Sequence, residues 1–210
     1  MRVLVACEYS GMVREAFAAR GWEAWSCDLL ESERPSLFHH QGDVRDLLTE
    51  EWDLLVGHPP CTYLTNSANK HLYLPDGSRD PARWEAMREG ADFFNLLWTA
   101  DVRHIALENP VMTGAARDLV GGKATQYIQP WQFGTAETKQ TGLRLKNLPK
   151  LVPTTNLHAE MKALPKSISH RVHYLSPGPN RWKERSRTYP GVAAAMAEQW
   201  GSHLEALVPA

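Results

Sequence analysis

Short apolar runs alternate along this chain with segments whose apolar residues recur at helical spacing, and this alternation constrains the fold most. Residues 2–7 form a largely apolar run with two valines, which is typical of a buried parallel strand. Helical spacing follows from Met12 to Gly21, and further strand-like runs occupy 22–27, 52–56 and 104–107. Strands that alternate with helices form a parallel sheet with right-handed crossovers. We therefore expect an α/β fold with a mostly parallel sheet and helices on both faces.

The rest of the chain extends this pattern. A third strand is expected to end at 42–44 and to lead into a short helix over 44–50, whereas 62–80 reads as a long structureless loop. A helix is expected to begin at Pro81, further strands to lie near 126–129 and 142–148, and an amphipathic helix to cover 191–203. These elements predict a main α/β domain over 1–148, a short basic region over 149–188, and a C-terminal helix, 189–210, that returns to the main domain.

Composition excludes several classes of protein. The 43% of apolar and 22% of charged residues are typical of a globular chain, and no apolar run is long enough to cross a bilayer. The three cysteines show no CxxC spacing, which argues against a disulfide framework and a cysteine metal site, and favours the cytoplasm.

The net charge is −8 over 1–110 and +7 over 111–210. A basic segment of this kind is either a solvated loop or a surface for a polyanion.

The unusual polar residues follow the ends of the expected strands. They are Glu8-Tyr9-Ser10-Gly11, Asp28, Asp43, Pro59-Pro60-Cys61 and Glu108-Asn109-Pro110. Ligands of open α/β sheets bind outside the carboxyl ends of the strands. We therefore expect these residues to line one cleft.

The first half of this cleft is suited to a nucleoside. Gly11 lets the backbone approach a ligand closely, and Asp28 is placed to accept hydrogen bonds from ribose hydroxyls. Asp43 is placed to accept from an exocyclic amine. No glycine-rich phosphate motif is present, so a nucleoside without pyrophosphate, such as S-adenosylmethionine, fits better. The alternative is that Asp28 and Asp43 only cap loops.

The second half of the cleft is suited to nucleophilic chemistry. Two prolines hold Cys61 on a stiff tether, and a thiolate is able to add to an electron-poor ring carbon. Glu108 lies at the next strand end, where a partly desolvated carboxyl group can protonate a ring nitrogen.

Together, Pro59-Pro60-Cys61 and Glu108-Asn109-Pro110 resemble motifs of the cytosine-C5 DNA methyltransferase family, and the resemblance extends over 1–147. The short length and the run 187–193 resemble the small members found in phages and prophages. The resemblance implies a Rossmann-like methyltransferase fold and methyl transfer from S-adenosylmethionine to C5 of a cytosine that is swung out of DNA, through a covalent Cys61 adduct at C6. Implied catalytic residues are Cys61, Glu108 and Arg144; cofactor residues are Tyr9, Ser10, Gly11, Asp28, Asp43 and Pro59; substrate residues are Asn109, Lys146, Arg185 and Arg187.

One departure from the family affects the expected partners. Only residues 150–185 stand where full-length relatives carry a target-recognition domain. We therefore expect low sequence specificity, or a homodimer or partner protein that supplies recognition. Two alternatives stay open: the same chemistry on single-stranded nucleic acid or a free pyrimidine nucleotide, and a non-catalytic methylase-like protein that binds DNA or another protein.

Overall fold

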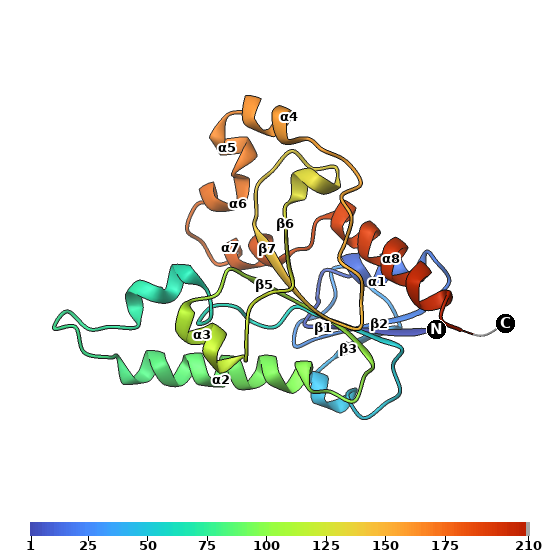
Figure 1. The fold of residues 1–210 in the computed structure, drawn as a ribbon, viewed down its shortest axis with the longest axis horizontal. Helices are drawn as coiled ribbons and strands as arrows, with labels where there is room; N and C mark the ends of the chain where they lie inside the picture. Colours follow the sequence, from blue (N-terminus) through green and yellow to red (C-terminus); the bar gives the residue numbers. More distant parts are fainter. Residues whose placement is uncertain (209–210) are drawn as a thin grey trace.

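The computed structural model describes residues 1–208, apart from the side chains of residues 68 and 70. Its centre is a seven-stranded sheet in the order β3-β2-β1-β4-β5-β7-β6 (Figure 1). The strands are β1 (Arg2–Ala6), β2 (Glu23–Asp28), β3 (His39–Gln41), β4 (Leu54–Gly57), β5 (His104–Pro110), β6 (Gln126–Ile128) and β7 (Thr141–Lys146). β1 to β5 run parallel, and β7 runs antiparallel to both of its neighbours. This topology confirms the expected Rossmann-like α/β fold of methyltransferases.

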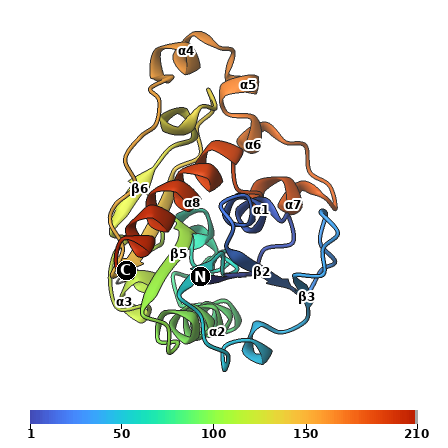
Figure 2. The same cartoon turned by 90° about the vertical axis from the view of Figure 1, so that its right-hand side faces the viewer.

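Helices cover both faces of the sheet. The α-helices are α1 (Met12–Ala18), α2 (Pro81–Trp98), α3 (Gly114–Leu119), α4 (His158–Ala163), α5 (Lys166–Ser169), α6 (Arg171–Tyr174), α7 (Arg181–Ser186) and α8 (Pro190–Glu205); short 3-10 turns lie at Val44–Asp46, Asn66–His71 and Pro130–Phe133. Figure 2 shows α1 and α8 on one face and α2 and α3 on the other. No helix of residues 1–208 is both long enough and apolar enough to span a bilayer.

Successive side chains along each central strand pack into two separate hydrophobic cores, one on each face of the sheet. Val3 and Val5 of β1 are fully buried beneath α1 and α8, where they join a cluster that includes Phe17 and Trp200. Leu4, between them, faces the opposite core beneath α2. Because successive side chains of a strand point to opposite faces, a strand buried on both sides is apolar throughout, as its sequence indicated.

The helix α8 packs against α1, so the two ends of the described chain meet in one core. The Arg20 guanidinium just after α1 pairs with Glu198 and Glu205 of α8. The indole Nε1 of Trp22 also donates to Glu205, at 2.7 Å. The division of the chain at 148 and 188 stays a prediction, and the last two residues of the predicted segment 189–210 lie outside the described residues.

Three local expectations are corrected. Residues 62–80 are not structureless: they contain the 3-10 turn Asn66–His71, and Leu64 and Leu72 are buried in the α2 core. Only Val44–Asp46 is helical within 44–50, as a single 3-10 turn. The third strand, expected to end at 42–44, is β3 and ends at Gln41; it pairs with β2, and its His39 ring contacts the Ser26 hydroxyl and the Leu30 carbonyl.

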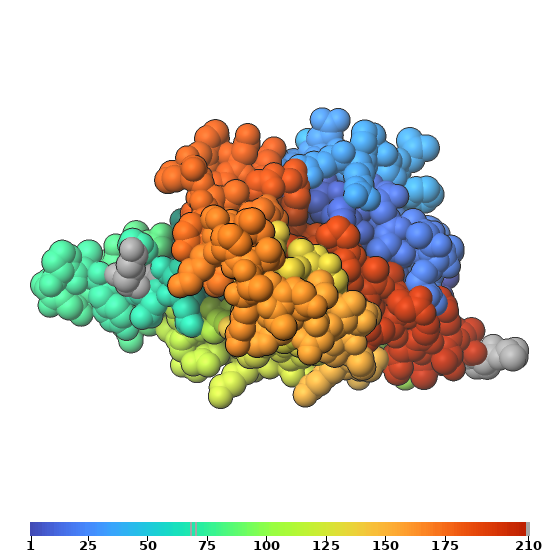
Figure 3. Space-filling model, turned by 90° about the horizontal axis from the view of Figure 1, so that it is seen from above, coloured from blue at the N-terminus to red at the C-terminus, as the bar shows by residue number. Residues whose placement is uncertain are grey.

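The basic region folds as four short helices above the carboxyl edge of the sheet (Figure 1). Met161 of α4 and Val172 of α6 are buried, whereas most of the segment is exposed. Figure 3 shows this region in orange as one face of the molecule, with the loop around 62–78 in teal at one end.

Candidate active site

The turn between β1 and α1 is built around the buried carboxylate of Glu8. Its Oε1 accepts hydrogen bonds from the Val13 amide at 2.6 Å and the Ser10 hydroxyl at 3.3 Å. Its Oε2 accepts from the Arg14 amide at 3.2 Å. Gly11 has φ of 67°, a left-handed conformation that glycine adopts without steric cost. A carboxylate at a helix N-terminus satisfies free amides and opposes the helix dipole, so Glu8 fixes the turn that carries the expected cofactor residues.

Tyr9 of that turn lies beneath α7. Its hydroxyl donates to the Lys183 carbonyl at 2.5 Å, and its ring centre is 6.1 Å from that of Trp182. The Arg187 guanidinium pairs with Glu33 in the loop after β2, with Nε 2.9 Å from the carboxylate. The basic region therefore closes over the β1–α1 turn.

The two aspartates expected to bind a nucleoside differ in their surroundings. Asp28 is half-buried at the end of β2, accepts from the Leu30 amide at 3.0 Å, and forms no ion pair with any described residue. Burial raises the pKa of Asp28. Asp43 instead accepts from the Arg45 amide and guanidinium, which lower its pKa. Asp28 thus keeps a carboxylate suited to ribose hydroxyls, whereas Asp43 already serves as the cap of a 3-10 turn.

Glu108 of β5 and His58, which directly follows β4, form a buried ion pair. His58 Nδ1 lies 2.9 Å from Glu108 Oε2, and the two side chains are only 10% and 12% exposed. The Lys139 ammonium lies 4.0 Å from Glu108 Oε1. Burial disfavours charge on both partners, but their hydrogen bond and mutual attraction outweigh it, so the pKa of His58 is raised and that of Glu108 is lowered. The other ring nitrogen of His58, Nε2, is buried without a partner.

Cys61 lies beside this ion pair. Its carbonyl accepts from the Leu64 and Thr65 amides, which closes a turn directly after the two prolines. Burial raises the pKa of the Cys61 thiol, the Glu108 charge raises it further, and the charges of Lys139 and Arg185 lower it. The Glu108 carboxylate therefore opposes ionisation of the Cys61 thiol, and the two cations favour it.

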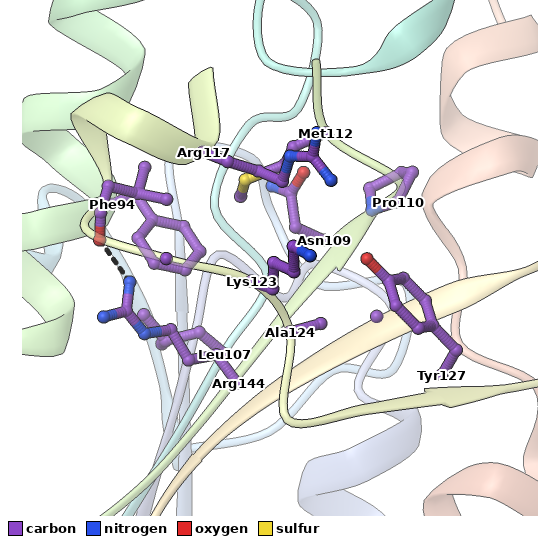
Figure 4. Close-up of a pocket in the computed structure, with 13 residues that line it drawn as sticks. Phe94, Leu107, Asn109, Pro110, Met112, Arg117, Lys123, Ala124, Tyr127 and Arg144 are labelled. Atoms are coloured by element: carbon purple, nitrogen blue, oxygen red, sulfur yellow. Dashed lines mark hydrogen bonds between the residues drawn. The ribbon is translucent and has the colours of Figure 1, made fainter. Parts of the chain in front are cut away.

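Three other expected site residues lie elsewhere. Arg144 pairs with Leu107 across β7 and β5, and it shares the α2 face, away from Glu108. Its guanidinium lies 4.3 Å from the Trp98 ring centre and donates to the Val120 and Gly121 carbonyls. Figure 4 shows Arg144 beside Leu107 among the residues that line a hollow on this face. The implied catalytic placement of Arg144 beside Cys61 and Glu108 is therefore corrected, because alternation along β7 directs its side chain to the opposite face of the sheet.

Lys146 is even further from the cluster, because β7 runs antiparallel and ends at the amino edge of β5. Its Nζ donates to the Val102 carbonyl at 3.1 Å, just before β5 begins. Asn109, next to Glu108, points to the α3 side of the sheet and lines a different hollow. Of the expected substrate residues, Arg185 lies near Cys61, and Arg187 is engaged in its pair with Glu33.

Sequence reasoning missed His58 and Lys139. A signal was available for His58, which immediately precedes the Pro-Pro-Cys run at a strand end. Lys139 carried none, since it approaches Glu108 only through the antiparallel pairing of β5 with β7. Within residues 1–208 no group of three or more His, Cys, Asp or Glu side chains is arranged to hold a metal ion.

Comparisons with known proteins give a similarity of fold. No protein-family model matches the chain, and no curated protein matches it. Similar solved structures include a protein described as a DNA modification methyltransferase encoded within a prophage of E. coli (14% identity, TM-score 0.43), the Entamoeba histolytica methyltransferase EhMeth (13%, 0.45) and the S. pombe Dnmt2 methyltransferase (15%, 0.45). The matched regions cover 79%, 74% and 96% of this chain, in the same order. They cover 55%, 57% and 66% of the chains of the three solved structures. Function is therefore argued from the site itself.

Proposed function

We propose that this protein transfers a methyl group from S-adenosylmethionine to C5 of cytosine in DNA, through a covalent adduct between Cys61 and C6. The observation that supports this proposal is the buried Glu108 carboxylate, held 2.9 Å from His58 Nδ1 just before the Pro59-Pro60-Cys61 run and 4.0 Å from the Lys139 ammonium. A nucleophile beside a group that can protonate the ring is what addition to a pyrimidine requires.

The chain's residues fit the donor in part. Asp28 offers a half-buried carboxylate without a counter-ion for the ribose, and Gly11 gives the close turn that precedes α1. When bound, S-adenosylmethionine supplies an electrophilic methyl group. Tyr9 and Ser10 belong to the same turn, and Pro59 is buried behind Cys61.

In the proposed mechanism Cys61 first loses its proton, and its sulfur forms a bond to C6. The electron pair of the C5–C6 double bond moves toward C5, while N3 is protonated from the Glu108–His58 pair. Because the pKa of His58 is raised and that of Glu108 is lowered, the proton for N3 comes from the His58 imidazolium and passes through the Glu108 carboxylate, 2.9 Å away. S-adenosylmethionine would supply the methyl group to C5, with its S–CH3 bond breaking to leave S-adenosylhomocysteine; a base would then take the C5 proton, and the electron pair of the C5–H bond would re-form the C5–C6 double bond as the C6–S bond breaks and releases Cys61.

The raised pKa of the Cys61 thiol has a consequence for this scheme. Little thiolate is present at neutral pH, so adduct formation is expected to accelerate as pH rises above neutrality. The cations Lys139 and Arg185 oppose this effect and stabilise the thiolate once it forms.

The experiment is covalent trapping. Protein and S-adenosylmethionine are incubated with duplex DNA containing 5-fluorocytosine, because fluorine at C5 cannot leave as a proton and the adduct persists under denaturing conditions. We expect a denaturant-resistant complex with the wild type and with Cys27→Ala, a control at a cysteine buried in the sheet, and none with Cys61→Ala. An adduct that persists in Cys61→Ala, or its absence in a wild type that binds the donor by calorimetry, contradicts the proposal.

A smaller substrate is a second candidate, favoured by the form of the basic region. Its helices α4 to α7 are four to six residues long, which leaves no long recognition helix for the major groove. Transfer of tritiated methyl groups to duplex DNA, single strands and dCMP distinguishes the two: duplex activity favours the main proposal, and activity restricted to single strands or dCMP favours the second.

A further inference from the structure

The tryptophan of α7 is unusual in its exposure. Of the eight tryptophans, all of which the structure describes, Trp182 alone lies largely in solvent, and it is 53% exposed. Tyr174 of the neighbouring α6 is 59% exposed. The Arg181 guanidinium donates to the Leu175 carbonyl at 2.9 Å and so ties the start of α7 to the end of α6. The two exposed aromatic residues therefore flank one junction within the basic region.

The basic region around these rings has little acid to balance its charge. Residues 149–188 contain eight Lys or Arg and two Glu. One of these acids, Glu184, is already paired with Arg171 and Arg187. Lys183 and Arg185 of α7 form no ion pair with any described residue. A surface of this kind fits a polyanion, whose phosphates supply affinity that does not depend on sequence.

The helix α7 links the two halves of the candidate active site. The Lys183 carbonyl accepts from the Tyr9 hydroxyl at 2.5 Å, which ties α7 to the β1–α1 turn. Just after α7, the Arg187 carbonyl accepts from the Lys139 ammonium at 3.3 Å, and the same ammonium lies 4.0 Å from Glu108. Figure 1 shows α7 above the carboxyl edge of the sheet. A ligand on α7 would therefore lie between the turn and Glu108.

The Trp182 ring is held in place by its neighbours although it is exposed. Its ring centre lies 6.1 Å from that of Tyr9, and the Lys183 ammonium lies 5.8 Å from the Trp182 ring. A positioned aromatic ring beside free cations is the combination that binds single strands, because bases of any sequence stack on the ring while cations meet the phosphates. Stacking requires a base that is free of its own stack, which a closed duplex does not offer.

We infer that α6 and α7 bind an unpaired stretch of nucleic-acid strand, with a nucleobase stacked on Trp182 and phosphates on Lys183 and Arg185. The strand is either a free single strand or one that is locally opened within a duplex. This inference deepens the proposed function, on which its assignment to the methylated substrate rests. The binding itself is measured without methyl transfer.

Fluorescence anisotropy with a labelled, cytosine-containing single-stranded oligodeoxynucleotide, in the absence of donor, tests the inference. We expect Trp182→Ala to weaken binding about 5- to 150-fold, because one base–aromatic stack is lost. Trp182→Phe keeps a ring and should weaken binding by less than about 5-fold. The control is Phe38→Ala, at an exposed aromatic residue outside the basic region, which should bind as the wild type does. Unchanged affinity in Trp182→Ala, or no binding by the wild type, overturns the inference.

Tryptophan fluorescence gives a readout that a structural role of Trp182 would not produce. A base stacked on an exposed indole quenches its emission, so the oligonucleotide should quench the wild type. Trp182→Phe should still bind, but its emission should change little at saturation. Equal quenching in the wild type and Trp182→Phe overturns the stacking contact.

The phosphate contacts have their own matched variants. Lys183→Gln and Arg185→Gln should each reduce the slope of log affinity against log salt concentration by about 0.7, the value for one phosphate of a single strand. Lys150→Gln removes the same charge at an exposed position that follows β7, at the opposite edge of the sheet, and should leave the slope unchanged. Equal reductions in all three variants would mean general electrostatics and would overturn the phosphate contacts.

The form of the strand is resolved by comparing a single strand, a matched duplex and a duplex that holds a mismatched cytosine. Binding that depends on Trp182 and is tightest for the single strand assigns a free strand, and tightest binding to the mismatch assigns a locally opened one. Tightest binding to the matched duplex overturns the inference, as does competition by polyglutamate equal to that by an oligonucleotide of the same charge, which would indicate an acidic protein partner. Cys61→Ala should bind as the wild type does, so failure of methyl transfer and failure of this inference are distinguishable.

Discussion

Replacing His58 by glutamine removes a buried positive charge and keeps a group that can donate to Glu108. The wild-type side chains are 10% and 12% exposed and 2.9 Å apart. Breaking a buried ion pair costs about 3–5 kcal/mol, and a retained hydrogen bond to a charged group offsets roughly 1–2 kcal/mol of this. We therefore expect His58→Gln to lower the free energy of unfolding by about 2–3 kcal/mol, or the melting temperature by roughly 4–12 °C.

The pH dependence identifies the cause. Because the pKa of His58 is raised in the folded state, the charge of His58 contributes its full stabilisation below pH 6.5, the ordinary pKa of histidine. This stabilisation is lost as pH rises through the pKa of the folded state. Because the pKa of Glu108 is lowered in the folded state, the charge of Glu108 contributes its full stabilisation above pH 4.5, its ordinary pKa. This stabilisation is lost as pH falls through the pKa of the folded state. The difference in the free energy of unfolding between the wild type and His58→Gln should therefore be largest between pH 4.5 and 6.5 and should decrease on either side.

Urea unfolding at several pH values measures this difference, and His104→Gln is the control. His104 is also buried, but it contacts the Asp53 carbonyl and not a carboxylate, and burial lowers its pKa. A double-mutant cycle with Glu108→Gln at pH 5.5 should give a coupling of about 1–3 kcal/mol. A His58→Gln effect that is constant with pH, together with a coupling near zero, would refute the reasoning.

Two further substitutions test the packing that positions the site. Glu8→Ala leaves two buried amides at the start of α1 unpaired and should lower the free energy of unfolding in urea by about 2–5 kcal/mol. Its control is Glu31→Ala at an exposed position, which should change that free energy by less than about 0.5 kcal/mol. Equal effects of the two substitutions would contradict the role of Glu8 at this turn. Gly191→Ala should lower the free energy of unfolding by more than about 2 kcal/mol, because a Cβ there would overlap the Phe133 carbonyl oxygen. Gly201→Ala in the same helix meets only the side chain of Arg20, which can move, and should be neutral or stabilising. Comparable thermal stability of the two alanine variants would refute this account.

The local pattern of the sequence predicted most of the sheet, because buried parallel strands are continuous apolar runs. It also predicted that Cys61 and Glu108 lie at the carboxyl ends of two strands, which are the neighbouring parallel strands β4 and β5; their catalytic roles stay predictions. Arg144 and Lys146 were misplaced because their positions depend on the direction and register of β7, which pairs with β5 across more than thirty intervening residues. Register over that separation is not encoded in local spacing.

The His58–Glu108 pair shows the same limit at the scale of one contact. The two residues are separated by 50 positions and meet only when β4 and β5 align. Sequence reasoning assigned Glu108 a raised pKa from burial alone, whereas the structure adds an imidazolium and an ammonium that lower it. A carboxyl group at a strand end can be located from sequence, but its proton affinity depends on neighbours that only folding supplies.

The packing of α8 against α1 has a consequence for how the chain is made. Phe17 of α1 shares its core with Trp200 of α8, which is synthesised much later. Translation proceeds at about 5–20 residues per second, so this apolar surface stays uncovered for roughly ten seconds or more. During that interval the uncovered surface is open to chaperones, and this core cannot close before α8 has been synthesised.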